Sequence, residues 1–168
     1  VVAEPLVAGG APVSSARIRA AIERGDVAEA RALLGRPPRL RGVVVHGAER
    51  GRLLGFPTAN LDPVADYVVP GHGVYAVRAA WLEPDGSRTV RAGAASLGIR
   101  PQFDAGAPSI EVHLLDFDGD LYGRELAVDF LSFLRPEARF DSVEALVAQM
   151  GRDVAAARVA AGESGAGA

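Results

Sequence analysis

The chain has 168 residues, 49% hydrophobic and 23% charged, as in a soluble globular protein of one domain with a further fragment. The net charge is −3, no basic run occurs and no apolar stretch is long enough to span a membrane, so neither nucleic acid nor membrane is expected as a partner. Cysteine is absent, which excludes disulfides and thiol nucleophiles and fits a cytoplasmic protein. All 18 basic residues are arginine, so a Walker A lysine and a protein-kinase lysine are excluded as well.

Two short helices are predicted in the first part of the chain. Ser14 is a suitable N-cap for the first, and Asp26, three residues before Glu29, forms a capping box for the second. Gly35 and the prolines at positions 37 and 38 end the second helix. We place a domain boundary at this proline pair.

After Leu40 the sequence is typical of short β-strands. Asp118-Gly119 is a two-residue hairpin signal. The strand spacing predicts a mainly β fold, a small antiparallel barrel. The predicted strands cover residues 43–45, 74–82, 88–92, 110–115 and 126–130.

A helix is predicted near the end of the chain. Asp141 with Glu144 resembles another capping box, followed by one buried apolar stripe at helical spacing. The stripe contains Val143, Leu146, Val147, Met150 and Val154. Residues 162–168 are small and are expected to form a disordered tail.

The segment with the clearest chemical signal is glycine-rich and covers residues 41–60. Clustered glycines let backbone amides approach an anion closely, so phosphate can be held without lysine. Two arginines could add charge-assisted hydrogen bonds. A glycine-rich β-turn region is the open alternative. The residues concerned are Gly42, Gly47, Gly51, Gly55, Arg50 and Arg52.

Directly after these glycines comes an extended stretch with two neutral oxygen donors. Pro57 fixes its own backbone and favours extended geometry at Phe56. Thr58 and Asn60 are two residues apart, so their side chains point to the same side of an extended segment. A hydroxyl and an amide oxygen suit Mg²⁺ bound to nucleotide phosphates, although the two side chains could instead stabilise a turn.

Several motifs in one order resemble the riboflavin kinase family, from Leu40 to Arg158. Each motif alone is short, and their shared order makes the resemblance specific. The motifs are GVVVHGAERG at 42–51, LGFPTAN at 54–60, GVY at 73–75, SLGIRPQF at 96–103, IEVH at 110–113, DLYG at 120–123, FLRPE at 133–137 and FDS at 140–142.

The resemblance implies a six-stranded antiparallel Greek-key barrel with a C-terminal α-helix, preceded by the two short helices. It implies phosphoryl transfer from ATP to riboflavin, with Glu111 as the general base for the 5′-hydroxyl of the ribityl chain. ATP phosphates would contact the glycine segment, with Mg²⁺ on Thr58 and Asn60. The nucleotide-binding set would be Gly47, Arg50, Gly51, Arg52, Gly55, Pro57 and Thr58, and the flavin-binding set Arg135, Tyr122 and Phe133.

The first helix carries a second resemblance. Residues 13–19, VSSARIR, resemble a motif near the end of FMN adenylyltransferase modules, which precede the kinase in bacterial bifunctional FAD synthetases. Residues 1–38 would then be a remnant of that module with its linker, and residues 39–161 the kinase domain. We expect no adenylyltransferase activity from this chain, because the nucleotide-binding half of that module is not in the sequence.

Two functions of other classes stay open at this point. A non-catalytic flavin- or nucleotide-binding barrel would keep the glycine segment without needing Glu111 as a base. An OB-like nucleic-acid barrel would need a basic groove and stacking rings, which a net charge of −3 and an aromatic fraction of 6% disfavour.

Overall fold

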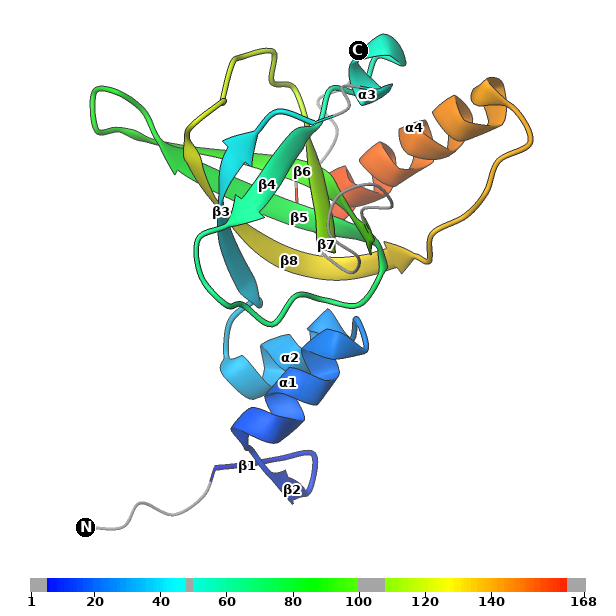
Figure 1. Cartoon of the computed structure of the whole chain (residues 1–168). Coiled ribbons are helices and arrows are strands. Elements are labelled where there is room, and N and C mark those ends of the chain that lie inside the picture. Colours follow the sequence, from blue (N-terminus) through cyan, green and yellow to red (C-terminus); the bar gives the residue numbers. More distant parts are fainter. Residues whose placement is uncertain (1–5, 48–49, 100–107, 163–168) are drawn as a thin grey trace.

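The computed structural model describes residues 6–47, 50–99 and 108–162, and its centre is a closed barrel of six antiparallel strands (Figure 1). The order around the barrel is β3-β4-β7-β6-β5-β8. Strands β5, β6 and β7 are sequential neighbours and β8 returns beside β5, so the predicted Greek-key barrel is confirmed. The strands are β3 (Arg39–Val45), β4 (Ala59–Pro63), β5 (Gly73–Leu82), β6 (Arg88–Ile99), β7 (Pro108–Leu114) and β8 (Glu125–Arg135).

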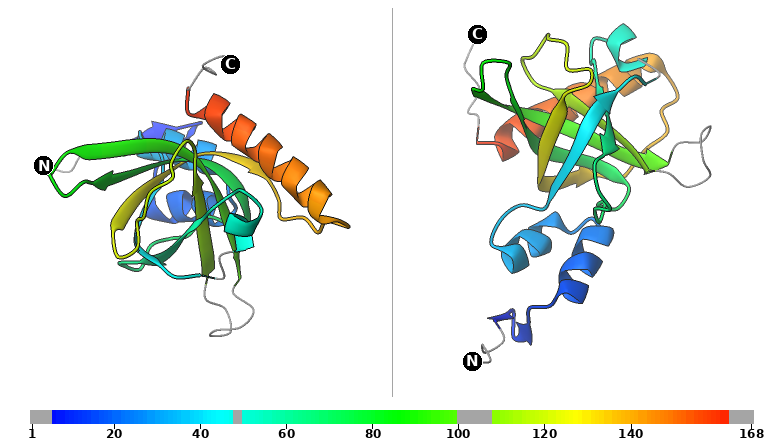
Figure 2. Two further views of the ribbon diagram at one scale, coloured as in Figure 1. Left: turned by 90° about the horizontal axis from the view of Figure 1, so that it is seen from above. Right: turned by 60° about the vertical axis from the view of Figure 1, so that its left-hand side comes forward.

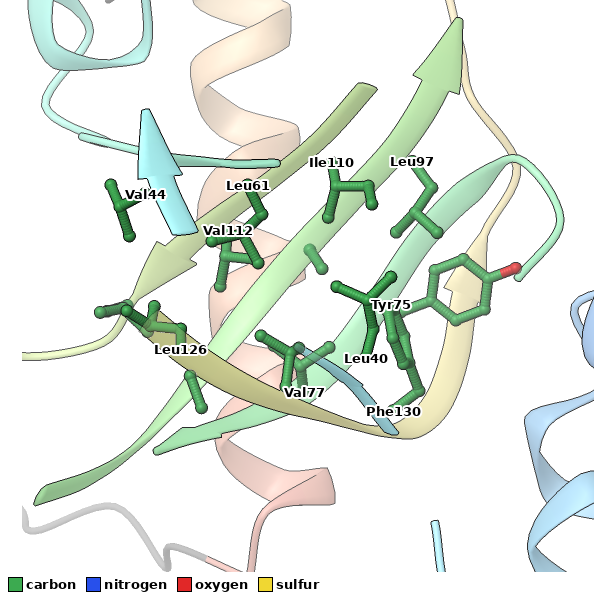
Figure 3. Close-up of a cluster of buried hydrophobic side chains, with 14 of the residues drawn as sticks. Leu40, Val44, Leu61, Tyr75, Val77, Leu97, Ile110, Val112, Leu126 and Phe130 are labelled. Carbon is green, nitrogen blue, oxygen red and sulfur yellow. The ribbon is translucent and has the colours of Figure 1, made fainter. Parts of the chain in front are cut away.

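Alternating side chains fill the barrel interior (Figure 3). On β7, Ile110 and Val112 are buried inside, while Glu111 and His113 between and after them are half-exposed on the outer face. This alternation follows from the two-residue period of a strand, and it separates an apolar interior from a polar outer face. The burial of Ile110 and Val112 therefore determines that Glu111 faces outward from β7.

The predicted hairpin at Asp118-Gly119 is wrong. Strands β7 and β8 are not neighbours, and the connection between them crosses the end of the barrel past β4 and β3. Gly119 serves a close contact instead, because a Cβ there would lie 2.4 Å from the ring of Phe117. The strand prediction also stopped β6 too early, since β6 continues to Ile99, and it missed β4 as a strand.

Helices α1 (Ser15–Glu23) and α2 (Val27–Leu34) lie together at one end of the barrel, preceded by the short pair β1 (Val7–Ala8) and β2 (Ala11–Pro12) (Figure 1). The predicted N-caps and the helix stop are confirmed, but the return half of the Asp26 capping box is absent, because the Glu29 carboxylate accepts from Arg17 and Arg24 instead. The Ser14 and Asp26 side chains accept the expected amide hydrogen bonds, and Gly35 ends α2 in the left-handed region. Val27 is 1% exposed and belongs to the same core cluster as the barrel interior, so α2 packs into the barrel end.

Helix α4 (Val143–Ala160) lies against the outside of the barrel, over β5, β6 and β8 (Figure 2). Its N-cap is Ser142, whose hydroxyl accepts from the Ala145 amide at 3.1 Å, so the predicted Asp141 capping box is wrong. The predicted stripe is only half-buried and Val143 is 56% exposed, whereas Asp153 and Ala157 are the buried positions. Within the described ranges, no helix is both long enough and apolar enough to cross a bilayer.

Candidate active site

A cavity of about 600 Å³ lies at the end of the barrel near the short helix α3 (Arg50–Leu53). One wall consists of residues 117–122, in the connection from β7 to β8, and is called the 117–122 wall below. Arg52, Pro57 and Thr58 also line the cavity. These three belong to the nucleotide-binding set predicted from the sequence, so a single cavity brings them together.

Thr58 connects this cavity to the predicted base. It lines the cavity, and its hydroxyl donates a hydrogen bond to Glu111 Oε2 at 3.3 Å. Ser109 donates to the other carboxylate oxygen of Glu111 at 3.4 Å. Glu111 therefore sits on the outer face of β7 at the edge of the cavity, with its carboxylate oriented by two hydroxyl groups.

Asn60 lies beside the same carboxylate, a proximity that comes from the pairing of β4 with β7. It pairs with Glu111 in the register of β4 and β7, so both side chains share one face of the sheet. Asn60 is 7% exposed, and a Cβ at Gly47 would approach its amide nitrogen to 2.1 Å. Gly47 is thus required for the close approach of Asn60.

The donor set of Thr58 and Asn60 fits a divalent ion that arrives with a nucleotide. Both are neutral oxygen donors, and Mg²⁺ is bound in such sites by few protein ligands together with phosphate oxygens. Among the residues that the structure describes, no group of three or more His, Asp or Glu side chains is placed to hold a metal by itself.

None of Gly47, Gly51 and Gly55 lines the cavity. Gly51 permits a tight turn, because a Cβ there would lie 2.3 Å from the Phe56 carbonyl oxygen. The Phe56 amide donates to the Gly51 carbonyl at 2.8 Å and the Gly55 amide to the Arg52 carbonyl at 3.2 Å. These contacts fix the chain that presents Arg52, Pro57 and Thr58. Arg50 begins α3, and its side chain lies outside the described part.

His113 was not singled out from the sequence as a site residue, although its spacing from Glu111 places both on the same face of the strand. Its Nδ1 donates to the Pro57 carbonyl at 2.8 Å, and its ring contacts Phe56 edge-on. It therefore holds the Phe-Pro-Thr segment against β7. The alternation rule could have identified this residue, because every second side chain of a half-buried strand faces outward.

The three predicted flavin residues do not lie together. Tyr122 belongs to the 117–122 wall and stacks on His46, with ring centroids 3.8 Å apart. Phe133 packs edge-on against Tyr75 at 5.3 Å, near the end of the barrel that α2 covers.

Arg135 is held by helix α4. Its Nη2 and Nε donate to the Asp153 carboxylate, at 2.7 Å and 3.0 Å for the shortest contacts, and its guanidinium lies over the Phe140 ring. Gln149 donates a further hydrogen bond to Asp153 at 2.8 Å. Since Asp153 is 6% exposed, this ion pair joins the end of β8 to the middle of α4.

Comparison with known proteins bears on the fold and the site together. The protein-family model described as Flavokinase, riboflavin kinase, matches residues 34–161, which include the cavity, Thr58 and Glu111. The chain belongs to the riboflavin kinase family. The match begins inside α2, so it covers the whole barrel and α4.

Similar proteins are bifunctional riboflavin kinase/FMN adenylyltransferases. The chain is 46% identical to that of Pseudomonas fluorescens over 156 residues, which are 92% of this chain and 48% of the relative. It is 44% identical to that of Listeria monocytogenes over 142 residues, with 84% and 44% covered. The chain therefore spans about half the length of these relatives.

Solved structures support the same fold. A Streptococcus pneumoniae structure described as a macrolide-efflux protein is 40% identical, with a TM-score of 0.84 over 92% of this chain and 49% of that one. The riboflavin kinase of Trypanosoma brucei is 28% identical, with a TM-score of 0.51 and 74% and 79% covered. The fold of this chain is thus similar to that of a solved riboflavin kinase.

Proposed function

We propose that this chain transfers the γ-phosphoryl group of ATP to the 5′-hydroxyl of the ribityl chain of riboflavin, which yields FMN and ADP. The observation that carries this proposal is the hydrogen bond from Thr58 to Glu111. Thr58 lines the cavity, so this single side chain connects the cavity to the carboxylate that would act as the base. Phosphoryl transfer needs mainly positioning and charge neutralisation. Glu111 takes the hydroxyl proton as the P–O bond forms, which is the role of a general base.

ATP occupies the cavity in this proposal. Arg52 lies on the cavity side formed by the glycine-rich segment, where a guanidinium can bind phosphate oxygens with charge-assisted hydrogen bonds. Gly47, Gly51 and Gly55 shape the segment, and Arg50 lies at its start. Tyr122 lines the cavity beside Asp120, so we now assign it to the nucleotide rather than to the flavin.

Thr58 and Asn60 would hold the metal, which we propose is Mg²⁺ bound with the nucleotide. When bound, the ion neutralises phosphate charge and orients the γ-phosphoryl group. Thr58 keeps its place through the extended backbone before β4, which His113 secures at the Pro57 carbonyl.

The flavin would approach Glu111 from the outer face of the barrel, on the side of α4. Arg135 lies on the same outer face, three strands away from Glu111. The register of neighbouring strands shows this, because residues paired across strands share a face: Glu111 pairs with Ser96, Ser96 with Val74, and Val74 with Arg135. We keep Arg135 as a proposed flavin contact on this face. Phe133 pairs with Tyr75, an interior residue, so its proposed flavin contact rests on the family resemblance alone.

The relatives suggest a larger context for this chain. We propose that in a full-length protein an FMN adenylyltransferase module adjoins α1 and that the enzyme is cytoplasmic.

The test is FMN formation from riboflavin and Mg-ATP, followed by chromatography, for this chain and for Glu111→Gln. The variant should lower kcat about 10²-fold or more and keep ADP binding, since only the base is removed. Glu125→Gln is the matched control, because Glu125 pairs with Arg41 on the barrel surface and does not line the cavity. If the parent chain binds riboflavin without forming FMN, the chain is a binding module and the proposal fails.

A further inference from the structure

A carboxylate that accepts three side-chain hydrogen bonds lies in the β5–β6 hairpin and is not one of the proposed catalytic residues. Glu83 follows the last residue of β5. Its Oε1 accepts hydrogen bonds from the indole nitrogen of Trp81 at 2.7 Å and from the Thr89 hydroxyl at 2.8 Å. Its Oε2 accepts from Arg124 Nη1 at 2.7 Å. Trp81 and Thr89 belong to the hairpin itself, whereas Arg124 lies outside it, so the carboxylate of this cluster ties the hairpin to another part of the chain.

The cluster reaches both ends of the 117–122 wall. Arg124 directly precedes β8, and its amide donates to the Leu121 carbonyl at 2.9 Å. At the other end, the ring of Trp81 contacts Phe117 edge-on, with centroids 5.1 Å apart. Leu121 and Phe117 both line the cavity. One carboxylate therefore fixes the partners of two cavity-lining residues.

The wall depends on such contacts because it lacks a sheet partner of its own. Strands β7 and β8 do not pair, so the chain between them crosses the barrel end without a continuous ladder of hydrogen bonds. Trp81 is 3% exposed, whereas the side chains of Glu83 and Arg124 are 29% and 33% exposed. The hydrogen bond from Arg124 holds the pKa of Glu83 below its usual range, so the carboxylate is charged at neutral pH.

We propose that Glu83 is a positioning residue that holds the 117–122 wall in the conformation that binds ATP. This inference rests on the proposed function, which places ATP in the cavity. A wall that adopts the binding conformation only part of the time weakens the apparent affinity by the inverse of that fraction. Glu83 contacts neither Thr58 nor Glu111, so it acts on nucleotide affinity rather than on the chemical step.

The test is the steady-state kinetics of Glu83→Gln. Glutamine can still accept from Trp81 and Thr89, but it loses the charge and turns an amide group toward Arg124. We expect KM for Mg-ATP to rise about threefold to tenfold, a range that reflects one partly exposed charge-assisted hydrogen bond. kcat and KM for riboflavin should stay within about twofold of the parent.

Two control variants separate positioning from general loss of structure. Asp85→Asn changes a carboxylate at the tip of the same hairpin, which caps the Ser87 amide at 2.8 Å and does not contact the wall. The double variant Glu83→Gln with Arg124→Gln should be no worse than Glu83→Gln alone, because both remove the same contact. Simple unfolding lowers the rate at saturation and leaves KM unchanged.

An unchanged KM for Mg-ATP in Glu83→Gln, or an equal rise in Asp85→Asn, would overturn the inference. Calorimetric titration of Mg-ADP measures nucleotide binding without catalysis, so it tests this inference separately from the proposed function. If the parent chain forms no FMN but binds Mg-ADP, weaker binding by Glu83→Gln still supports the inference and equal binding refutes it. If the parent chain binds no Mg-ADP, both proposals fail.

Discussion

Replacing Val27 by alanine tests whether α2 belongs to the folding unit of the barrel. Val27 is 1% exposed and packs with the barrel interior. The change removes two buried methyl groups, which contribute about 0.8 kcal/mol each, and the remaining cavity adds to the loss. We expect the free energy of unfolding to fall by about 2 kcal/mol and the Tm by about 4–8 °C.

Thermal unfolding followed by circular dichroism measures this effect. Val159→Ala is the matched control, because Val159 is 79% exposed on α4 and the same two methyl groups are removed there. The control should melt within about 1 °C of the parent, since surface changes away from special features have small effects. A Val27→Ala variant as stable as the control, or a separate early transition of the helices, would refute the view that α2 is part of the barrel unit.

Two further predictions concern titration and the buried ion pair. Burial raises the pKa of Tyr75 to about 12, so between pH 10 and 12 the unfolded chain loses a proton that the folded chain keeps. Stability should therefore fall by up to about 2–3 kcal/mol over that window, measured by urea unfolding, and Tyr75→Phe should lack this part of the fall. An identical fall in the variant would contradict the assignment. Arg135→Ala should cost about 2–3 kcal/mol because it leaves the Asp153 carboxylate with only Gln149, and adding Asp153→Ala should recover part of that loss in chemical denaturation. If Arg135→Ala is as stable as the parent but fails to bind riboflavin, Arg135 serves the flavin alone.

The local patterns predicted much of the fold and the chemistry of the site. The strand containing Glu111 followed from alternation, and the helix caps at Ser14 and Asp26 followed from side-chain types at fixed offsets. The common side of Thr58 and Asn60 followed from their spacing in an extended segment. These features depend on neighbours within a few residues, which is why periodicity and capping rules identify them.

The sequence alone failed where the answer depended on distant segments. Asp118-Gly119 has the composition of a hairpin, yet barrel closure separates β7 from β8 by two strands and turns the connection into a cavity wall. The buried face of α4 likewise depended on where the helix lies on the barrel.

The sequence by itself therefore determined the strand-forming segments, the helix ends and the set of residues with suitable chemistry. Only the tertiary structure decided that Asn60 lies opposite Glu111, that Thr58 donates to that carboxylate and that Val27 enters the barrel. The physical reason is that strand register and barrel closure join residues about fifty positions apart, and the free energy that selects them comes from packing of the whole core rather than from any local pattern.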